Sequence, residues 1–283
     1  MPSPTSMLRP SKPQAKGGGG GETITPAQLA LPLDAGIFQR GFNALAQMLE
    51  AQGGIDAYLE QLRAKVALFQ SLLSREQVRS LDASALHQLV EQMFTVRRKL
   101  WPVLHELGAE AVAEQVADLL YGNGPVAERM RRFEAAIPAE GKPKRSLRDF
   151  AAELLHFNDP ERYPLMTRWV WDQGTVSGAL REFVSGNDHM QEVPFGEAPE
   201  VFEGARAWLR ERLAEQGVYR DLPLLIDLIL AHQYSEYLRA MAEGFLRSDF
   251  GGQSDPAEHI SKLLGIDSHR RQGASRVKKE TLH

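Results

Sequence analysis

The chain has 283 residues, of which 43% are hydrophobic and 25% charged, and these are ordinary values for a globular protein with a sizeable core. It contains no cysteine, which excludes disulfides, thiolate zinc sites, iron–sulfur clusters and a cysteine nucleophile. The net charge is −4, but residues 1–21 and 267–283 each carry +3, so the body between them carries −10. Basic arms on an acidic body can reach an anionic partner or fold back on the body itself.

The N-terminal residues 1–22 are polar, rich in Pro and Ser, and include five consecutive glycines. Because ordering such a segment is entropically costly, it is predicted to be a disordered tail. It lacks the apolar stretch of a secretory signal, and the most apolar run, residues 222–231, is far shorter than the roughly 20 residues that cross a bilayer. These features predict a cytoplasmic protein with no membrane partner.

Residues 23–136 are predicted to form an N-terminal helical subdomain. Thr25-Pro26-Ala27-Gln28 matches a capping box and predicts a very short helix. The spacing of apolar residues over 38–49 predicts a helix, and residues 55–73 carry an apolar seam at steps of three and four. We interpret this seam as one side of an intramolecular helical hairpin, and packing against a partner helix is the alternative.

The rest of this subdomain is predicted to contain three more helices. Ser74-Arg75-Glu76-Gln77 matches a second capping box. A single helix is expected over residues 83–107 with a kink at Pro102, followed by helices at residues 112–119 and 126–136.

Residues 137–145, with two prolines and a glycine, predict a loop and the best internal boundary. Residues 146–266 are predicted to form a C-terminal helical subdomain, and residues 267–283 a disordered basic tail. The helices expected in this subdomain begin near residues 146, 175, 201, 221 and 255, with a loop over residues 185–198. No credible strand is present. The predicted fold class is therefore all-α, a multi-helix bundle of about ten helices with disordered basic N- and C-terminal tails.

Two basic segments are candidate partner-binding sites. One lies inside the chain, and the other is the C-terminal tail. Neither segment contains interleaved aromatic residues, so base stacking is not expected there. The candidate residues are Arg129, Arg131, Arg132, Lys142, Lys144, Arg145 and Arg148 in the first segment, and Arg270, Arg271, Arg276, Lys278 and Lys279 in the second.

A possible pocket is suggested by helical Glu/His pairs and by an aromatic segment. Glu153 and His156 share a helix face, and so do His232 and Glu236, so the four could bind a metal if their helices faced each other. Surface pairs or satisfied buried histidines are the preferred interpretation. Tyr163, Trp169 and Trp171 belong to an aromatic cluster over residues 154–172 that is either a ligand pocket or core, and core is preferred.

The sequence leads to three functional hypotheses. The first is a non-catalytic accessory or adaptor protein that acts through contacts with another protein, possibly an acidic one. The second is a nucleic-acid-associated protein that uses the basic segment 129–148 and the C-terminal tail. The third is a helical metalloenzyme around Glu153/His156 and His232/Glu236. No catalytic residue, metal or cofactor is assigned, and the balance leans away from an enzyme.

Overall fold

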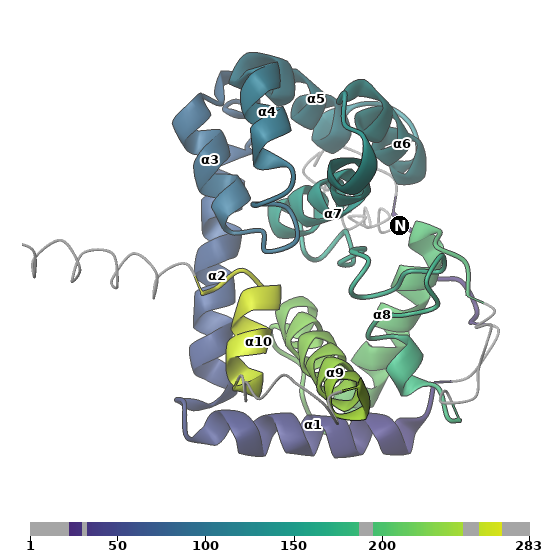
Figure 1. The fold of residues 1–283 in the computed structure, drawn as a ribbon. Coiled ribbons are helices and arrows are strands. Elements are labelled where there is room, and N and C mark those ends of the chain that lie inside the picture. The colour runs from purple at the N-terminus through teal and green to yellow at the C-terminus, as the bar shows by residue number, and fades with distance from the viewer. Residues whose placement is uncertain (1–22, 30–32, 187–194, 246–254, 268–283) are drawn as a thin grey trace, which may run out of the picture.

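The computed structural model describes residues 23–29, 33–186, 195–245 and 255–267, and within these ranges the chain is an all-α bundle (Figure 1). In place of a sheet, the described residues contain one isolated bridge between Asp172 and Ser177. Two short 3₁₀ turns, η1 (Val78–Ser80) and η2 (Arg181–Phe183), complete the elements. The ten α-helices in these ranges are α1 (Ala35–Glu50), α2 (Gly54–Leu72), α3 (Ala83–Glu91), α4 (Trp101–Leu107), α5 (Ala109–Tyr121), α6 (Val126–Ala136), α7 (Gly141–Asn158), α8 (Pro199–Glu215), α9 (Leu222–Phe245) and α10 (Pro256–Leu263).

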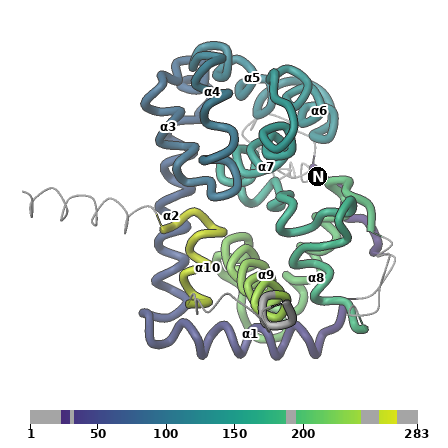
Figure 2. The backbone as a smooth tube through the Cα atoms, in the orientation of Figure 1, coloured from purple at the N-terminus to yellow at the C-terminus, as the bar shows by residue number. Residues whose placement is uncertain are grey.

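The helices surround α7 and α9. In Figure 1, α1 lies across one end of the molecule, and α2 rises from it along one side toward α3. Helices α3 to α6 form the opposite end, and α8 lies on the side away from α2, as the backbone trace also shows (Figure 2). Helix α7 packs on α2, α5 and α6, whereas α9 packs on α1, α2, α8 and α10. None of the described helices is long and apolar enough to cross a membrane.

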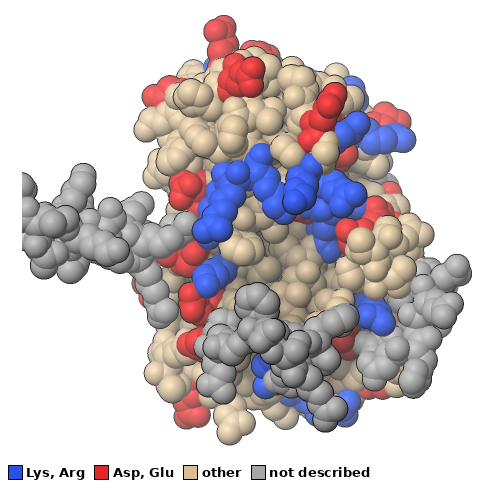
Figure 3. Space-filling model, viewed as in Figure 1, with Lys and Arg blue, Asp and Glu red and all other residues tan. Residues whose placement is uncertain are grey.

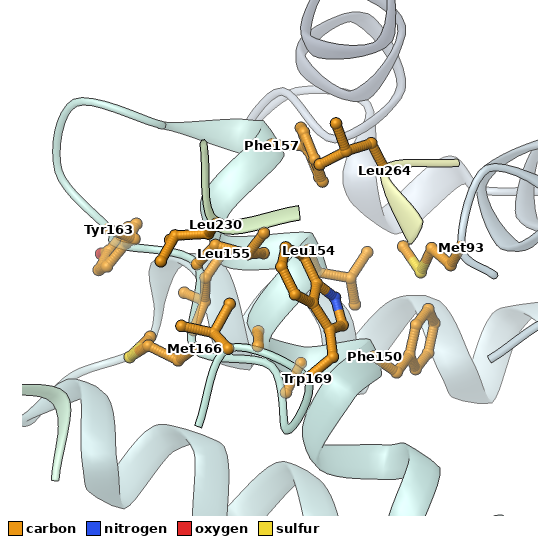
Figure 4. Close-up of a cluster of buried hydrophobic side chains, with 14 of the residues drawn as sticks. Met93, Phe150, Leu154, Leu155, Phe157, Tyr163, Met166, Trp169, Leu230 and Leu264 are labelled. Atoms are coloured by element: carbon orange, nitrogen blue, oxygen red, sulfur yellow. The ribbon is translucent and has the colours of Figure 1, made fainter. Parts of the chain in front are cut away.

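One continuous hydrophobic core joins the two ends of the molecule. Met93, Phe150, Trp169 and Leu264 come from four separate segments and meet in one cluster (Figure 4). Every residue of α7 from Phe150 to Phe157 is buried, because helices cover it on several sides. Burial at roughly 25 cal/mol per Å² of apolar surface therefore stabilises both halves together.

The predicted helix at Thr25–Gln28 is wrong. Residues 23–29 run without helical structure along α8, where the Ala27 amide donates to Glu200 O at 2.8 Å. A Cβ on Gly204 would lie 2.3 Å from Ala27 O, so the glycine permits this close approach. The Ala27 amide is therefore satisfied by α8 rather than by a turn of helix.

The single kinked helix predicted over residues 83–107 is also wrong. Helix α3 ends at Glu91, consecutive turns occupy residues 94–100, and α4 begins at Trp101 with Pro102 in its first turn. Proline has no amide hydrogen and is tolerated where the first helical donors are unpaired. Pro102 therefore begins a helix instead of kinking one.

Three shorter predictions need correction. The capping box at residues 74–77 opens a run of turns that leads into η1 rather than an α-helix. The helix predicted over residues 175–184 is reduced to turns and η2. The loop predicted over residues 137–145 is shorter, because α7 begins at Gly141 and includes Pro143 in its first turn.

The predicted N-terminal tail and most of the loop predicted over residues 185–198 lie outside the described residues, as does the C-terminal tail from residue 268 onward. Asp267 was assigned to that tail and is instead part of the fold. It is 8% exposed and ion-paired with Arg97. The division into two subdomains remains a prediction.

Candidate anion-binding surface

The turns between α3 and α4 present a short basic edge. Met93, Val96 and Leu100 recur at steps of three and four and are fully buried. Backbone bonds from Arg97 N to Met93 O (2.9 Å) and from Leu100 N to Val96 O (2.9 Å) hold the turns in place. Because the buried residues fix one side of this segment, Arg98 and Lys99 are left exposed on the other.

The start of α7 lies against this edge. Ser146 is buried, and its hydroxyl donates to Thr95 O at 3.3 Å and to Lys142 O at 3.4 Å. Lys142, Lys144 and Arg145 occupy the exposed side of the same helical turns. Two basic segments more than forty residues apart in sequence are therefore held side by side.

The first turn of α7 adds to the positive potential. Glu140 at its N-cap forms no side-chain capping hydrogen bond, and Pro143 contributes no amide hydrogen. The amides of Gly141 and Lys142 are among the first donors of the helix, which lack intrahelical acceptors and carry the positive end of its dipole. An anion placed here meets a helix terminus as well as cationic side chains.

Arg131 on α6 extends the basic surface to the other side of α7. With Lys144 it lines an open groove that also contains Glu134, Ile137 and Glu140. Burial raises the pKa of Glu134, while nearby Arg148 and Lys144 act in the opposite direction. The groove is therefore mixed in charge, whereas its rim toward the start of α7 is basic.

We call the exposed cationic side chains of these three segments the basic band. Figure 3 shows Lys and Arg crossing this face of the molecule above a hollow lined mostly by uncharged residues. Within the described ranges, none of the six members forms an ion pair with an acidic side chain. The band consists of Arg98, Lys99, Arg131, Lys142, Lys144 and Arg145.

Three of the residues predicted for this surface serve the fold instead. Arg129 is 4% exposed and donates to Leu120 O at 3.0 Å, to the Tyr163 hydroxyl at 3.0 Å, and to Leu119 O. Those carbonyls end α5, so the guanidinium closes a helix C-terminus. Arg132 pairs with Asp118 at 3.1 Å and Arg148 pairs with Glu197. Arg129 is buried and the other two have acidic partners, so these three are not counted with the exposed, unpaired cations of the basic band.

An exposed aromatic ring lies beside the band. Phe94 is 40% exposed, which is unusual for a residue of this size. The Arg97 guanidinium lies 5.1 Å from the ring centroid, and Arg97 is itself held by Asp267 at 3.2 and 3.3 Å. The residues after Asp267 carry the remaining basic candidates, Arg270, Arg271, Arg276, Lys278 and Lys279, which lie outside the described ranges.

The four side chains proposed as metal ligands do not gather. Glu153 binds Lys65 at 2.9 Å, His156 binds Asp227 at 2.7 Å, and Glu236 pairs with Arg239 at the surface. His232 is buried, and burial lowers its pKa from the ordinary 6.5. No group of three potential ligands occurs in the part of the chain that the structure describes.

His156 and Asp227 form a buried pair rather than a site open to substrate. Nδ1 of His156 faces Tyr163 O at 2.8 Å, and Nε2 faces the Asp227 carboxylate. Both ring nitrogens therefore have an oxygen within hydrogen-bond distance inside the protein. The cavity beside them, with Arg206 on its wall, encloses about 10 Å³, which is the space of one water molecule.

The aromatic segment 154–172 lies in the core, as the preferred interpretation predicted. Tyr163, Trp169 and Trp171 are at most 4% exposed. The indole of Trp171 donates to Gly196 O at 3.1 Å, and the Tyr163 hydroxyl accepts from Arg129. Their polar atoms therefore have partners inside the protein, as buried Trp and Tyr require.

Comparison with models of known protein families, with curated proteins and with solved structures found no match. The band is therefore interpreted from its own geometry.

Sequence reasoning missed Phe94, Arg98 and Lys99, which the fold brings to the start of α7. A run Val96-Arg97-Arg98-Lys99 was visible in the sequence, but it lay in the middle of a predicted helix. A single helix over residues 83–107 would have spread these side chains around its circumference. Recognising Pro102 as a helix start would have placed them on a turn instead.

Proposed function

We propose that this protein is a non-catalytic accessory protein that holds a polyanionic partner along the basic band. The observation that carries the proposal is the convergence of six exposed cations from three segments on a body with a net charge of −10. Like charges held together repel one another, so a fold that assembles them without acidic partners favours binding of an external anion. This keeps the accessory role and specifies the chemistry of its partner.

The position of the C-terminal residues supports the same proposal. Asp267 is anchored to Arg97, the immediate sequence neighbour of Arg98. The next sixteen residues carry five Lys or Arg and one acidic residue, so the chain continues from the edge of the band with the same sign of charge. A polyanion bound on the band would have these further cations within reach, which adds to its electrostatic attraction.

Retention on immobilised heparin tests the proposal. The triple variant Lys142→Gln, Lys144→Gln, Arg145→Gln removes half of the band. The matched control is Arg40→Gln, Arg79→Gln, Arg220→Gln, three exposed positions on α1, η1 and the turn before α9. Both variants change the net charge by the same amount, so any difference between them reports the local surface.

We expect the wild-type protein to bind in low salt despite its acidic composition, and the band variant to elute at clearly lower salt. The control should elute like the wild type, because exposed charges elsewhere contribute little to a local contact. Equal elution shifts in the two variants, or no wild-type retention in low salt, would contradict the proposal.

A further inference from the structure

We propose that the polyanion is a single-stranded nucleic acid and that Phe94 provides the surface on which one of its bases stacks. This inference rests on the proposed function and deepens it. The two basic segments by themselves predict no base stacking, and Phe133, the aromatic residue within segment 129–148, is buried. The fold overturns that expectation by placing Phe94 in the same turns as Arg98 and Lys99.

The first argument is the exposure of the Phe94 ring. A phenylalanine that keeps 40% of its surface open forgoes part of the stabilisation that full burial of such a side chain provides. The neighbouring Met93 and Val96 are fully buried, so the same turns bury other apolar side chains while the Phe94 ring stays exposed. An exposed ring within a cationic surface is the combination by which proteins bind single strands, with cations on phosphates and the ring on a base.

The second argument is that the ring is fixed in place. The Arg97 guanidinium lies 5.1 Å from the Phe94 centroid and donates two hydrogen bonds to the Asp267 carboxylate, which hold it in place. Arg97 is 7% exposed and already paired, so its role is to position the ring rather than to meet phosphate. A preorganised ring loses less conformational freedom when a base stacks on it.

The third argument concerns the choice between nucleic acid and an acidic protein. Carboxylates of an acidic segment need cations alone, and nothing in such a partner requires an exposed ring among them. A single strand offers phosphates together with unpaired bases, whereas a duplex keeps its bases stacked inside. The cations of the band are distributed over three segments. A strand with phosphates spaced along it can contact several of them at once, whereas a ligand with one anionic group cannot.

The experiment measures binding by fluorescence anisotropy with three probes: fluorescein-labelled oligothymidylate of 20 nucleotides, a labelled duplex of 20 base pairs, and a labelled 20-residue polyglutamate. The full-length protein is used with Phe94→Leu, which keeps an apolar side chain without a π face, and with Phe94→Tyr, which restores the ring. The heparin-defective triple variant of the band is included for comparison.

We expect the wild type to bind the single strand more tightly than the duplex. Stacking of one base corresponds to roughly a 5- to 150-fold change in Kd, so Phe94→Leu should weaken oligothymidylate binding by about that factor. The same substitution should leave polyglutamate binding unchanged, and Phe94→Tyr should bind like the wild type. The band variant should lose affinity for every probe, with a shallower dependence on salt.

Each other outcome identifies what has failed. Binding to polyglutamate or heparin without binding to either oligonucleotide leaves the proposed function intact and overturns the nucleic-acid inference. Duplex binding as tight as single-strand binding, or a Phe94→Leu protein that binds oligothymidylate like the wild type, also overturns it. A protein that binds none of the polyanions would remove the inference and the proposed function together.

Discussion

At the scale of single residues, Gly265 shows how closely the C-terminal end of α10 meets the rest of the fold. Its φ is +70°, and a Cβ built on it would lie 1.7 Å from Gln92 O and 3.1 Å from the Lys65 ammonium. A side chain at this position must displace backbone as well as adopt a left-handed conformation. Gly217 has a similar φ of +74° but open space around it.

This pair of glycines gives a controlled prediction. Gly217→Ala should lower the free energy of unfolding by about 1 kcal/mol, the strain of a left-handed alanine. Gly265→Ala should cost clearly more than its control, because the Gln92 carbonyl must also move. Urea unfolding followed by circular dichroism measures both, and equal losses would contradict the close approach at Gly265.

His232 makes stability depend on pH. Burial lowers its pKa in the folded protein below the ordinary 6.5, while Glu236 raises it and Arg239 lowers it further. As the pH falls below 6.5, the unfolded chain binds a proton at this residue before the folded protein does, so folding loses free energy. We expect the melting temperature to fall as the pH is lowered from 7.5 to 5.5.

The control for that prediction is His232→Gln, which removes the titrating group and keeps a polar side chain. Its melting temperature will differ from that of the wild type at pH 7.5, but the difference between pH 7.5 and pH 5.5 should become smaller. A variant with an unchanged pH dependence would show that other groups cause it.

At the scale of elements, α7 carries three buried ionisable side chains on one face, and each pairs with a different segment. Asp149 binds Arg168 at 2.7 Å, Glu153 binds Lys65 on α2, and His156 binds Asp227 on α9. Spacings of four and three residues place these side chains along a single stripe. A buried charge without a counter-charge is strongly unfavourable, so the stripe fixes which elements can pack against α7.

Lys65 is the most connected member of this network. Its ammonium donates to Glu153 Oε2, Gln92 O and Leu264 O, each at 2.9 Å, and lies 3.7 Å from the Phe157 ring centroid. All three of its donors are used. Burial lowers the pKa of Lys65, and the Glu153 carboxylate opposes that effect. Burial likewise raises the pKa of Glu153, which Lys65 opposes.

We predict strong coupling between these two residues. Lys65→Met alone should lower the free energy of unfolding by about 3–5 kcal/mol, because the Glu153 carboxylate is left buried and unpaired. Adding Glu153→Leu should recover part of that loss. A double-mutant cycle by urea unfolding measures the coupling, and two losses that simply add would contradict it.

The sequence predicted the helices but not this stripe. Periodic apolar residues located most helices, because one face of each packs against a common core. Glu153 and His156 lie at helical spacing among apolar residues, a pattern that favours a surface pair or a satisfied buried histidine over metal ligands but does not identify their partners. The structure shows that the partners of the stripe are Arg168, Lys65 and Asp227. Lys65 and Asp227 are distant in sequence from α7, so no local sequence pattern predicts these pairs. Arg98 and Lys99 escaped prediction for the same reason, whereas the sequence analysis names the other four residues of the basic band.

At the scale of the whole molecule, the described fold includes Asp267, the residue at which the predicted C-terminal tail begins. Arg97 and Asp267 are both nearly buried, and two hydrogen bonds join them. Removing residues 268–283 should leave the melting temperature unchanged and weaken polyanion binding, because five cations are lost. Heparin elution and thermal unfolding of the truncated chain check both parts.

Asp267→Ala in the full-length chain is the complementary change. It leaves the Arg97 guanidinium without its carboxylate, so we expect a loss of about 3 kcal/mol in the free energy of unfolding. A truncated chain that melts lower than the wild type, together with an unaffected Asp267→Ala protein, would show that the predicted tail does not begin after Asp267.

The pairing of Lys65 with Glu153 also bears on how the chain could be divided. Residues 137–140 connect α6 to α7, with Pro138 and Glu140 exposed, and the helices that pack on α7 come from both sides of this connection in the sequence. We expect the two fragments of a protein cleaved there to stay together. Separating them would leave Lys65 on one fragment and Glu153 on the other without its ion-pair partner. Co-expressed halves split at residue 139 should therefore reassemble into a single complex on gel filtration. Either half produced without the other should be poorly soluble.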